Sequence, residues 1–535
     1  MKSQYPIILL YFFGSILLLF PIFSDWRFNL IGILSTDNLD TLGLQYSFSN
    51  PKSRFFPIGF NSNTLTPNFL DHLLFWCFQW LPFPFSHSLT VVCILTLNGI
   101  AGHFLGEALA YKDQSPQQSQ LKGYWIGWNV LAMEALWREM NIGHMPQILL
   151  FAPIFSLAFT LRWQYDHQPK NLYLAAFFYA LAGMSYWFWL PMLSPIICVI
   201  LFKKWAALFR LHMMGLLLLL PNLYWLFFKS SGMVPNPIEK NSSNHLELFQ
   251  AHSNDWMWWW SNAPMDVSNR ISLLLLGMVI WQLLQKKQKP FWAFSMVLLG
   301  MVMLLGNHSI LYFLYDIPPL SRLMWPERWG WLVGLGLCIL AMPRQITHGH
   351  LIWLPLIFLE LSIQSHNFPV QSTSLRPLQC YEQLQSAKGA ILELPLEKSD
   401  PLYNRMNVTQ QLHQQNLVNP IILPPNHFPL LEWEEYKDQA WLQHFDGKGI
   451  LQPEDIQQAR NEGVSLILID SSNLSAPHQS SPIIQHIIPL LGPPINLGCA
   501  LIWPLIPSEQ HYQQYPQLTF PKIQRPIHQE PIHVW

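Results

Sequence analysis

The sequence predicts an α-helical polytopic membrane protein with about eleven transmembrane helices, followed by a small C-terminal α/β domain. Apolar stretches crowd the first 365 of the 535 residues. Hydrophobic residues make up 51% of the chain and charged residues only 11%, against about 25% charged in soluble domains. The remainder is polar and rich in proline, as a segment that folds in water would be. We therefore place a transmembrane domain at 1–365 and a soluble domain at 366–535.

The apolar segments are taken in order. The first, 5–23, follows Lys2 and lacks a small-residue cleavage signal, so it predicts a retained anchor helix with its N-terminus in the cytoplasm. Further spans are expected near 86–109, 123–139, 146–163, 171–186, 187–202, 209–228, 271–285, 290–306, 328–343 and 350–365. The stretch 171–202 is either a tight hairpin around Pro191, which we favour, or one long tilted helix.

Basic residues in short loops predict the orientation, because Lys and Arg concentrate on the cytoplasmic side. The expected cytoplasmic groups are Lys112 and Lys122; Arg162 and Lys170; Lys203, Lys204 and Arg210; Lys286, Lys287 and Lys289; and Arg344. With eleven spans, the loop 24–85 and the C-terminal domain then share the extracytoplasmic side of a bacterial inner membrane. Within that loop, 68–80 has apolar residues at helical spacing and predicts a helix lying in the membrane interface.

Strand-like and helical segments alternate in the C-terminal domain. AILELPL (390–396) and VSLILID (464–470) predict strands, and PEDIQQARNEG (453–463) predicts a helix, which together indicate a small α/β domain. No Gly-rich phosphate loop, GxSxG or HExxH motif is present, so recognition or shielding is expected of it rather than catalysis. Cys380 and Cys499 bracket it; they either pair or stay separate, since sequence does not give their distance.

Composition also excludes some function classes. The net charge of -1 supplies no field that would gather nucleic acid, so no nucleic-acid partner is expected. The six cysteines show no CxxC or Cys/His spacing, so a zinc site is not indicated.

An acidic pair stands near the start of the first long loop. Asp37 and Asp40, in STDNLDTLG, are three residues apart, which on a helix places both on one face. Two such carboxylates can deprotonate a hydroxyl or hold a divalent ion against a phosphate. Alternatively, both are solvated loop residues, with Asp37 as an N-cap.

Cationic and buried ionisable residues give further candidates. Arg322 and Arg328 precede a late span, where arginine either clasps a phosphate or snorkels to the interface. Ionisable groups at membrane depth are costly and therefore functional candidates. Glu139 and His144, between the third and fourth spans, are expected to line the same cavity as Asp37.

Four short elements carry a resemblance to a known family. They are Asp37 or Asp40 in the first loop, Pro57-Ile58-Gly59 later in that loop, Pro326-Glu327-Arg328 before a late span, and Glu393-Leu394-Pro395 at the start of the soluble domain. In their order along the chain they resemble the GT-C superfamily of polytopic glycosyltransferases, and more narrowly an uncharacterised bacterial subgroup. Relatives often carry an arginine where this chain has Met324, and Arg322 is the nearest substitute.

The resemblance implies a membrane glycosyltransferase that moves a sugar from a polyprenyl-phosphate-linked donor to an extracytoplasmic acceptor. It implies Asp37 or Asp40 as the catalytic carboxylate, with Mg²⁺ or Mn²⁺ there if a metal is used. Arg328, Arg322, Glu139 and His144 become candidate contacts for the lipid phosphate or donor. Two alternatives stay open: a transporter or lipid flippase, and a non-catalytic scaffold of envelope polysaccharide assembly. Met324 in place of arginine, and the spacing DNLD in place of an adjacent acidic doublet, also leave room for a non-catalytic member of the family.

Overall fold

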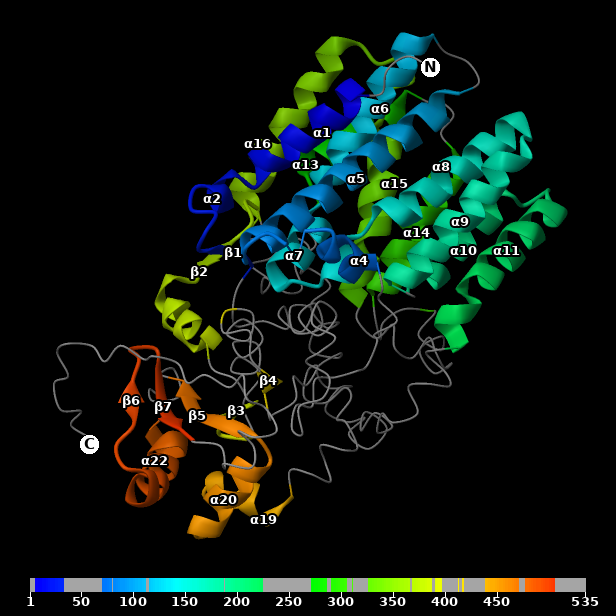
Figure 1. Ribbon diagram of the computed structural model, residues 1–535. Coiled ribbons are helices and arrows are strands. Elements are labelled where there is room, and N and C mark those ends of the chain that lie inside the picture. Colours follow the sequence, from blue (N-terminus) through cyan, green and yellow to red (C-terminus); the bar gives the residue numbers. More distant parts are fainter. Residues whose placement is uncertain are drawn as a thin grey trace.

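The computed structural model describes residues 5–32, 70–78, 80–111, 115–186, 188–224, 271–285, 290–305, 310, 326–365, 368–386, 390–396, 412, 416–417, 438–470 and 477–505. It contains a large helical part and a smaller part built around a sheet (Figure 1). Each part has its own apolar core, and a third cluster packs η12 (Arg376–Ser386) against the sheet.

Every apolar segment expected from the sequence overlaps a helix. The helical part comprises α1 (Tyr5–Leu18), α2 (Phe20–Phe23), α4 (Leu70–Trp76), α5 (Phe85–Ala110), α6 (Pro116–Leu131), α7 (Glu134–Ile142), η3 (Met145–Ile148), α8 (Phe151–Asp166), α9 (Pro169–Ser185), α10 (Trp189–Ile200), α11 (Trp205–Tyr224), α13 (Leu273–Leu284), α14 (Phe291–Leu304), η10 (Pro326–Trp329), α15 (Gly330–Ala341), η11 (His348–Ile352) and α16 (Trp353–Gln364). Among the described residues, Phe85–Ala110 and Met145–Asp166 are long and apolar enough to cross a membrane, and the other apolar helices are shorter. The count of about eleven spans stays a prediction.

Two segments differ in detail from the expectation. The segment 123–139 is not one helix, because the chain turns at Ala132–Met133 and α7 begins at Glu134. The turn keeps Glu134, Arg138 and Glu139 buried within the protein, where lipid would leave such charges unsolvated. The stretch 171–202 does form two helices, but they part at 186–188 rather than around a proline.

The helices α5 and α6 lie in unusually close contact, and glycine permits it. A Cβ added at Gly102 would come within 2.9 Å of the Gly127 Cα, and one at Gly106 within 2.2 Å of the Lys122 carbonyl oxygen. Small residues allow membrane helices to approach this closely, so their backbones pack directly. The α5–α6 pair forms the centre against which α1 and α8 pack.

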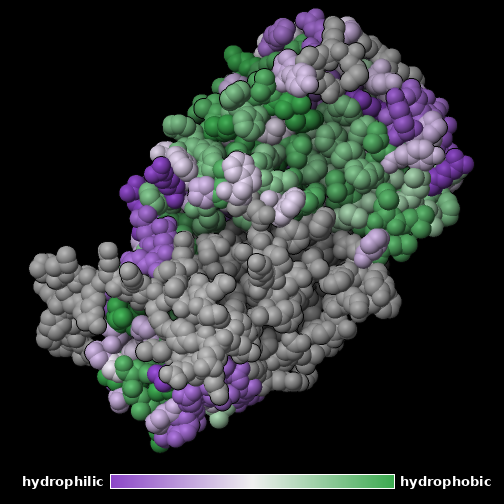
Figure 2. Space-filling model, in the orientation of Figure 1, coloured by the Kyte–Doolittle hydropathy of each residue, from purple (hydrophilic) through white to green (hydrophobic). Residues whose placement is uncertain are grey.

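The outer surface of the helical part is apolar, as lipid contact requires. On the face shown in Figure 2, hydrophobic residues cover most of the middle of this part, and hydrophilic residues gather toward its ends. Large exposed apolar side chains include Phe13, Leu17, Phe209, Leu217, Leu220, Trp281, Leu284, Phe291, Leu298, Leu359 and Ile363. They belong to α1, α11, α13, α14 and α16. An apolar surface of this extent would be unfavourable in water, and a bilayer is its natural surrounding.

The sheet-containing part begins with β2 (Ser372–Ser374) and η12 (Arg376–Ser386). Its further elements are β3 (Ala390–Leu394), β4 (Asn416–Leu417), α19 (Ala440–Phe445), α20 (Pro453–Asn461), β5 (Val464–Asp470), α22 (Pro477–Leu491), β6 (Ile495–Asn496) and β7 (Ala500–Pro504). The five-stranded order is β4-β3-β5-β7-β6. Strands β4, β3 and β5 are parallel, whereas β7 is antiparallel to both of its neighbours. The predicted strands at 390–396 and 464–470 are thus β3 and β5, and the helix predicted at 453–463 is α20.

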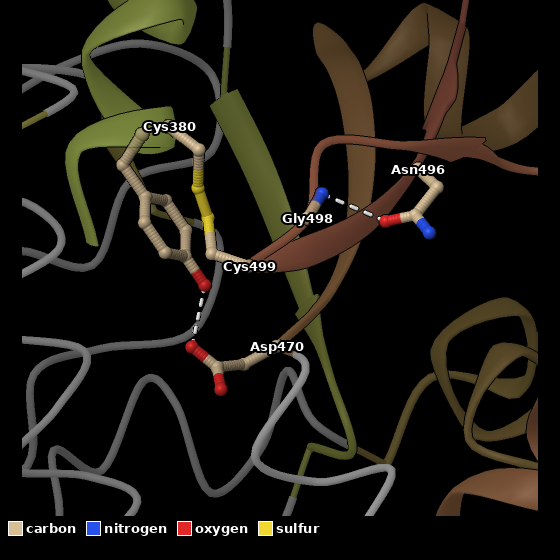
Figure 3. Close-up of a disulfide and its surroundings, with 6 residues drawn as sticks. Cys380, Asp470, Asn496, Gly498 and Cys499 are labelled. Atoms are coloured by element: carbon tan, nitrogen blue, oxygen red, sulfur yellow. Dashed lines mark hydrogen bonds between the residues drawn. A yellow bond between two sulfur atoms is a disulfide. The ribbon is translucent and has the colours of Figure 1, made fainter. Parts of the chain in front are cut away.

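A disulfide joins η12 to β7. Cys380 and Cys499 are bonded, with their Cα atoms 6.2 Å apart (Figure 3). Next to it, the buried Tyr381 hydroxyl donates to the Asp470 carboxylate at the end of β5. Of the two possibilities left open by the sequence, the pairing is therefore the one found.

A two-stranded sheet connects the beginning of the chain to the sheet-containing part. β1 (Asn29–Ile31) pairs antiparallel with β2, and Leu30 packs with η12 and the face of the large sheet. The Arg376 guanidinium donates to the Asp25 carboxylate at 2.7 Å. We call the end of the helical part at which β1 and β2 lie the sheet end, and the other the far end (Figure 1).

α6 and α15 pack antiparallel. Their contacts show which helix ends lie at the sheet end and which at the far end. Gln118, at the start of α6, exchanges hydrogen bonds with Ile346 beyond the end of α15. At the other end, Met133 lies against Gly334. Helix directions then place α7 and the starts of α5, α10 and α15 at the sheet end. The described basic residues of the predicted cytoplasmic loops lie toward the far end: Lys122, Arg162, Lys170, Lys203, Lys204, Arg210 and Arg344.

Candidate functional site

The turn after α7 fixes two of the predicted residues, Glu139 and His144, against each other. α7 ends at Gly143, whose φ of 76° is the left-handed conformation that glycine adopts without strain. This reversal lets the His144 backbone N–H donate to the Glu139 carbonyl oxygen at 2.9 Å. The chain next enters η3 at Met145. The backbone therefore returns His144 to the side of the helix that carries Glu139.

The side chains of these residues form a linked acid–base group. His144 Nδ1 lies 2.8 Å from Glu139 Oε2. Arg138 donates from Nε to Glu139 Oε1 at 3.0 Å and also from a terminal guanidinium nitrogen. Arg138 and Glu139 are buried, whereas the His144 side chain is 26% exposed. Charge-assisted hydrogen bonds on both oxygens favour the ionised carboxylate and leave the imidazole as the accessible member.

Arg328 lies on η10, directly before α15, and is held by aromatic side chains. Its guanidinium donates to the Tyr186 hydroxyl at 2.6 Å. The guanidinium carbon is 5.8 Å from the ring centroids of both Tyr186 and Phe188. The side chain is half-buried, and contacts of this kind orient a planar guanidinium while leaving it charged. Sequence reasoning missed Tyr186, which is 142 residues away and carries no motif.

The start of the first loop is attached to α7. The Gly32 N–H donates to the Gln371 carbonyl oxygen at 2.9 Å, and the Gln371 N–H donates to the Asn141 side chain at 2.7 Å. Asn141 follows Glu139 by two residues on the same helix. The chain therefore leaves the described region at 32, beside the Glu139–His144 group, and re-enters it at 70 in α4, which contacts η3. Asp37, Asp40, Arg322 and Pro57-Ile58-Gly59 lie outside the described residues.

A pocket opens at the sheet end between α6, α7, α13, α15 and α16. Its lining includes Asn129, Glu134, Ser272 and Gly330, together with apolar side chains. Glu360 of α16 accepts from the Leu273 backbone N–H at 2.6 Å and from the Leu274 N–H at 3.2 Å, so it caps the start of α13. The carboxylate thereby satisfies donors that would otherwise face lipid.

Other predicted features belong to different elements from the Glu139–His144 group. Glu393 of the E-L-P segment is a buried residue of β3, which lies between β4 and β5 in the large sheet. A separate ion-pair cluster lies toward the far end, where Arg162 donates to Glu107 at 3.1 Å. In the part of the chain that the structure describes, no three His, Cys, Asp or Glu side chains are grouped as a metal site would require. The Mg²⁺ or Mn²⁺ site that the resemblance implies, at Asp37 or Asp40, lies outside these residues and stays a prediction.

Comparison with known proteins gave structural matches alone. No family model matches the chain, and no curated protein matches its sequence. Two solved structures of the arabinofuranosyltransferase AftD from Mycobacteria are similar, at TM-scores of 0.49 and 0.47 and sequence identities of 13% and 12%. Each match covers 88% of this chain but 37% and 35%, respectively, of AftD, so the chain spans little more than a third of that protein's length.

Proposed function

We propose that the chain is a membrane glycosyltransferase that moves a sugar from a polyprenyl-phosphate-linked donor to an extracytoplasmic acceptor. The observation that carries the proposal is the hydrogen-bonded path from Gly32 through Gln371 to Asn141. It anchors the start of the loop that contains Asp37 beside the Glu139–His144 group.

In the proposed reaction, Asp37 or Asp40 accepts the proton of the acceptor hydroxyl as its oxygen attacks the anomeric carbon. The bond from that carbon to the phosphate oxygen breaks, and the phosphate departs with the electron pair. Arg328 is suited to the charge that develops there, because its guanidinium is preorganised by Tyr186 and by the neighbouring ring of Phe188. Arg322 is proposed as a second contact of the same phosphate.

The sidedness of the chain supports an extracytoplasmic site. Basic residues gather toward the far end, as in a cytoplasmic face. At the opposite end, the sheet-containing part carries the Cys380–Cys499 disulfide, and disulfides persist mainly in oxidising compartments outside the cytoplasm. The described candidates Glu139 and His144 belong to α7 and the residue after it, at this same sheet end. Trp76 and Trp80, in and just after α4, which contacts η3, are exposed, as suits a membrane interface.

The decisive test replaces the acidic pair. Membranes that contain the Asp37→Asn/Asp40→Asn variant are supplied with radiolabelled polyprenyl-phosphate pentoses and hexoses, and transfer to membrane or envelope acceptors is measured. We expect transfer to fall by about 10²-fold or more. The control is Asp438→Asn/Glu454→Gln, which neutralises two exposed carboxylates of the soluble part and should leave transfer unchanged.

Unchanged transfer by the loop variant would reject the proposed roles of the acidic pair. Movement of the labelled lipid across proteoliposomes without any new covalent product would instead identify a transporter or flippase. The proposed Mg²⁺ or Mn²⁺ requirement is checked in the same assay by chelation with EDTA, followed by addition of each metal separately.

A further inference from the structure

We propose that His144 is the general acid of this transfer and that Glu139 is its positioning residue. The inference rests on the function proposed above and assigns a role that the acidic loop cannot fill. A carboxylate that removes the acceptor proton does not supply a proton to the departing phosphate. A second, protonatable group near the donor is therefore chemically useful, and an imidazole is well suited to it.

The first step of the argument is the geometry of the imidazole. Its Nδ1 is hydrogen-bonded to Glu139 Oε2 at 2.8 Å. Among the residues that the structure describes, no hydrogen-bond partner reaches its Nε2, and the side chain is 26% exposed. A buried carboxylate on one nitrogen and an accessible second nitrogen is the arrangement by which proteins orient a histidine for proton transfer.

The second step concerns charge. Arg138 donates to the other oxygen of the Glu139 carboxylate, so the carboxylate that holds the imidazole is itself fixed in place. Burial of Glu139 and Arg138 limits screening by water, so their hold on the imidazole is stronger than it would be at a surface. A backbone hydrogen bond from the His144 N–H to the Glu139 carbonyl oxygen also holds these two residues together.

The third step is placement. α7 lies at the sheet end (Figure 1), and η3 follows it along the chain. η10, which carries Arg328, directly precedes α15, and α7 packs against α15. A donor phosphate bound at this end would meet Arg328, which is permanently cationic, and His144, which can donate a proton. As the bond between the anomeric carbon and oxygen breaks, its electron pair stays on the phosphate oxygen, and Nε2 donates its proton there. The acceptor's proton goes to the loop aspartate, and water restores both groups.

The test compares His144→Gln and His144→Ala in the full chain with the donor assay described above. Glutamine can still donate to Glu139 but cannot act as an acid. We expect kcat to fall by about 10²-fold or more with the donor KM little changed. Added imidazole should restore part of the rate of the alanine variant, which a purely structural role would not allow. His348→Gln, an exposed histidine at the far end, is the matched control.

Three results overturn the inference. A His144→Gln rate within about threefold of wild type would do so while leaving the proposed function intact. A slow alanine variant that melts at the wild-type temperature and gains nothing from imidazole would assign His144 to another role. Absence of transfer by the wild-type chain with every donor would remove the proposed function and this inference together.

Discussion

Replacing Gly106 by alanine should separate the two central helices. The new Cβ would lie 2.2 Å from the Lys122 carbonyl oxygen and 2.7 Å from the Gly123 nitrogen, where ordinary contact begins at 3.4 Å. Both neighbours are backbone atoms, so no rotamer change can relieve the clash. The helices must move apart by about 1 Å, which forfeits a quarter to a half of the dispersion energy of each affected atom pair.

The matched control is Gly277→Ala on α13, because a Cβ there meets nothing within 4 Å. Both variants gain the same helix propensity, so their difference isolates packing, which we expect to be about 1–3 kcal/mol. Unfolding of the purified chain in mixed detergent micelles by increasing dodecyl sulfate measures the difference. If Gly106→Ala were as stable as Gly277→Ala to within about 0.5 kcal/mol, the close α5–α6 contact would be wrong.

The remaining predictions concern the sheet end and the soluble part. Replacing Cys380 and Cys499 by serine removes a link across 119 residues and should lower the stability of the soluble part by about 2–5 kcal/mol, seen as faster proteolysis at increasing urea. Leu30→Ala should cost about 2–5 kcal/mol because the side chain is buried. Arg376→Ala should cost less than about 1 kcal/mol because that ion pair is exposed; equal melting temperatures of these two variants would contradict both estimates. Glu360→Gln weakens the cap of α13 and should cost about 1 kcal/mol in a thermal melt in detergent, whereas an unchanged melt would refute the cap.

The sequence predicted what depends on local patterning. Apolar runs located the helices, and runs of β-branched and aliphatic residues located β3 and β5, because burial selects these side chains position by position. The break between α6 and α7 was missed, since 123–139 reads as one apolar segment although its last turns carry Glu134 and Arg138. Charges that belong to a protein-facing turn look the same in sequence as charges within a span.

The candidate site was only partly predictable for a related reason. Glu139 and His144 were expected to share a cavity, and the structure brings them into direct contact. Asn141 and Tyr186 were not expected, because their partners are 230 and 142 residues away. A polar side chain that holds a distant backbone group leaves no periodic signal. The roles of the loop aspartates and of Arg322 stay predictions.

The pairing of β1 with β2 has a consequence for how the chain is made. Gly32 and Thr373, joined by a hydrogen bond beside these strands, are 341 residues apart, a distance that translation covers in roughly 20 to 70 s. Throughout that interval, β1 has emerged without its partner strand, and Leu30 has no core to enter. Since an unpaired strand edge invites association with other chains, the nascent protein must shield this short segment until its C-terminal third arrives. Interruption of synthesis before residue 372 would therefore leave an aggregation-prone membrane fragment. We expect cells that produce this protein to degrade such fragments quickly.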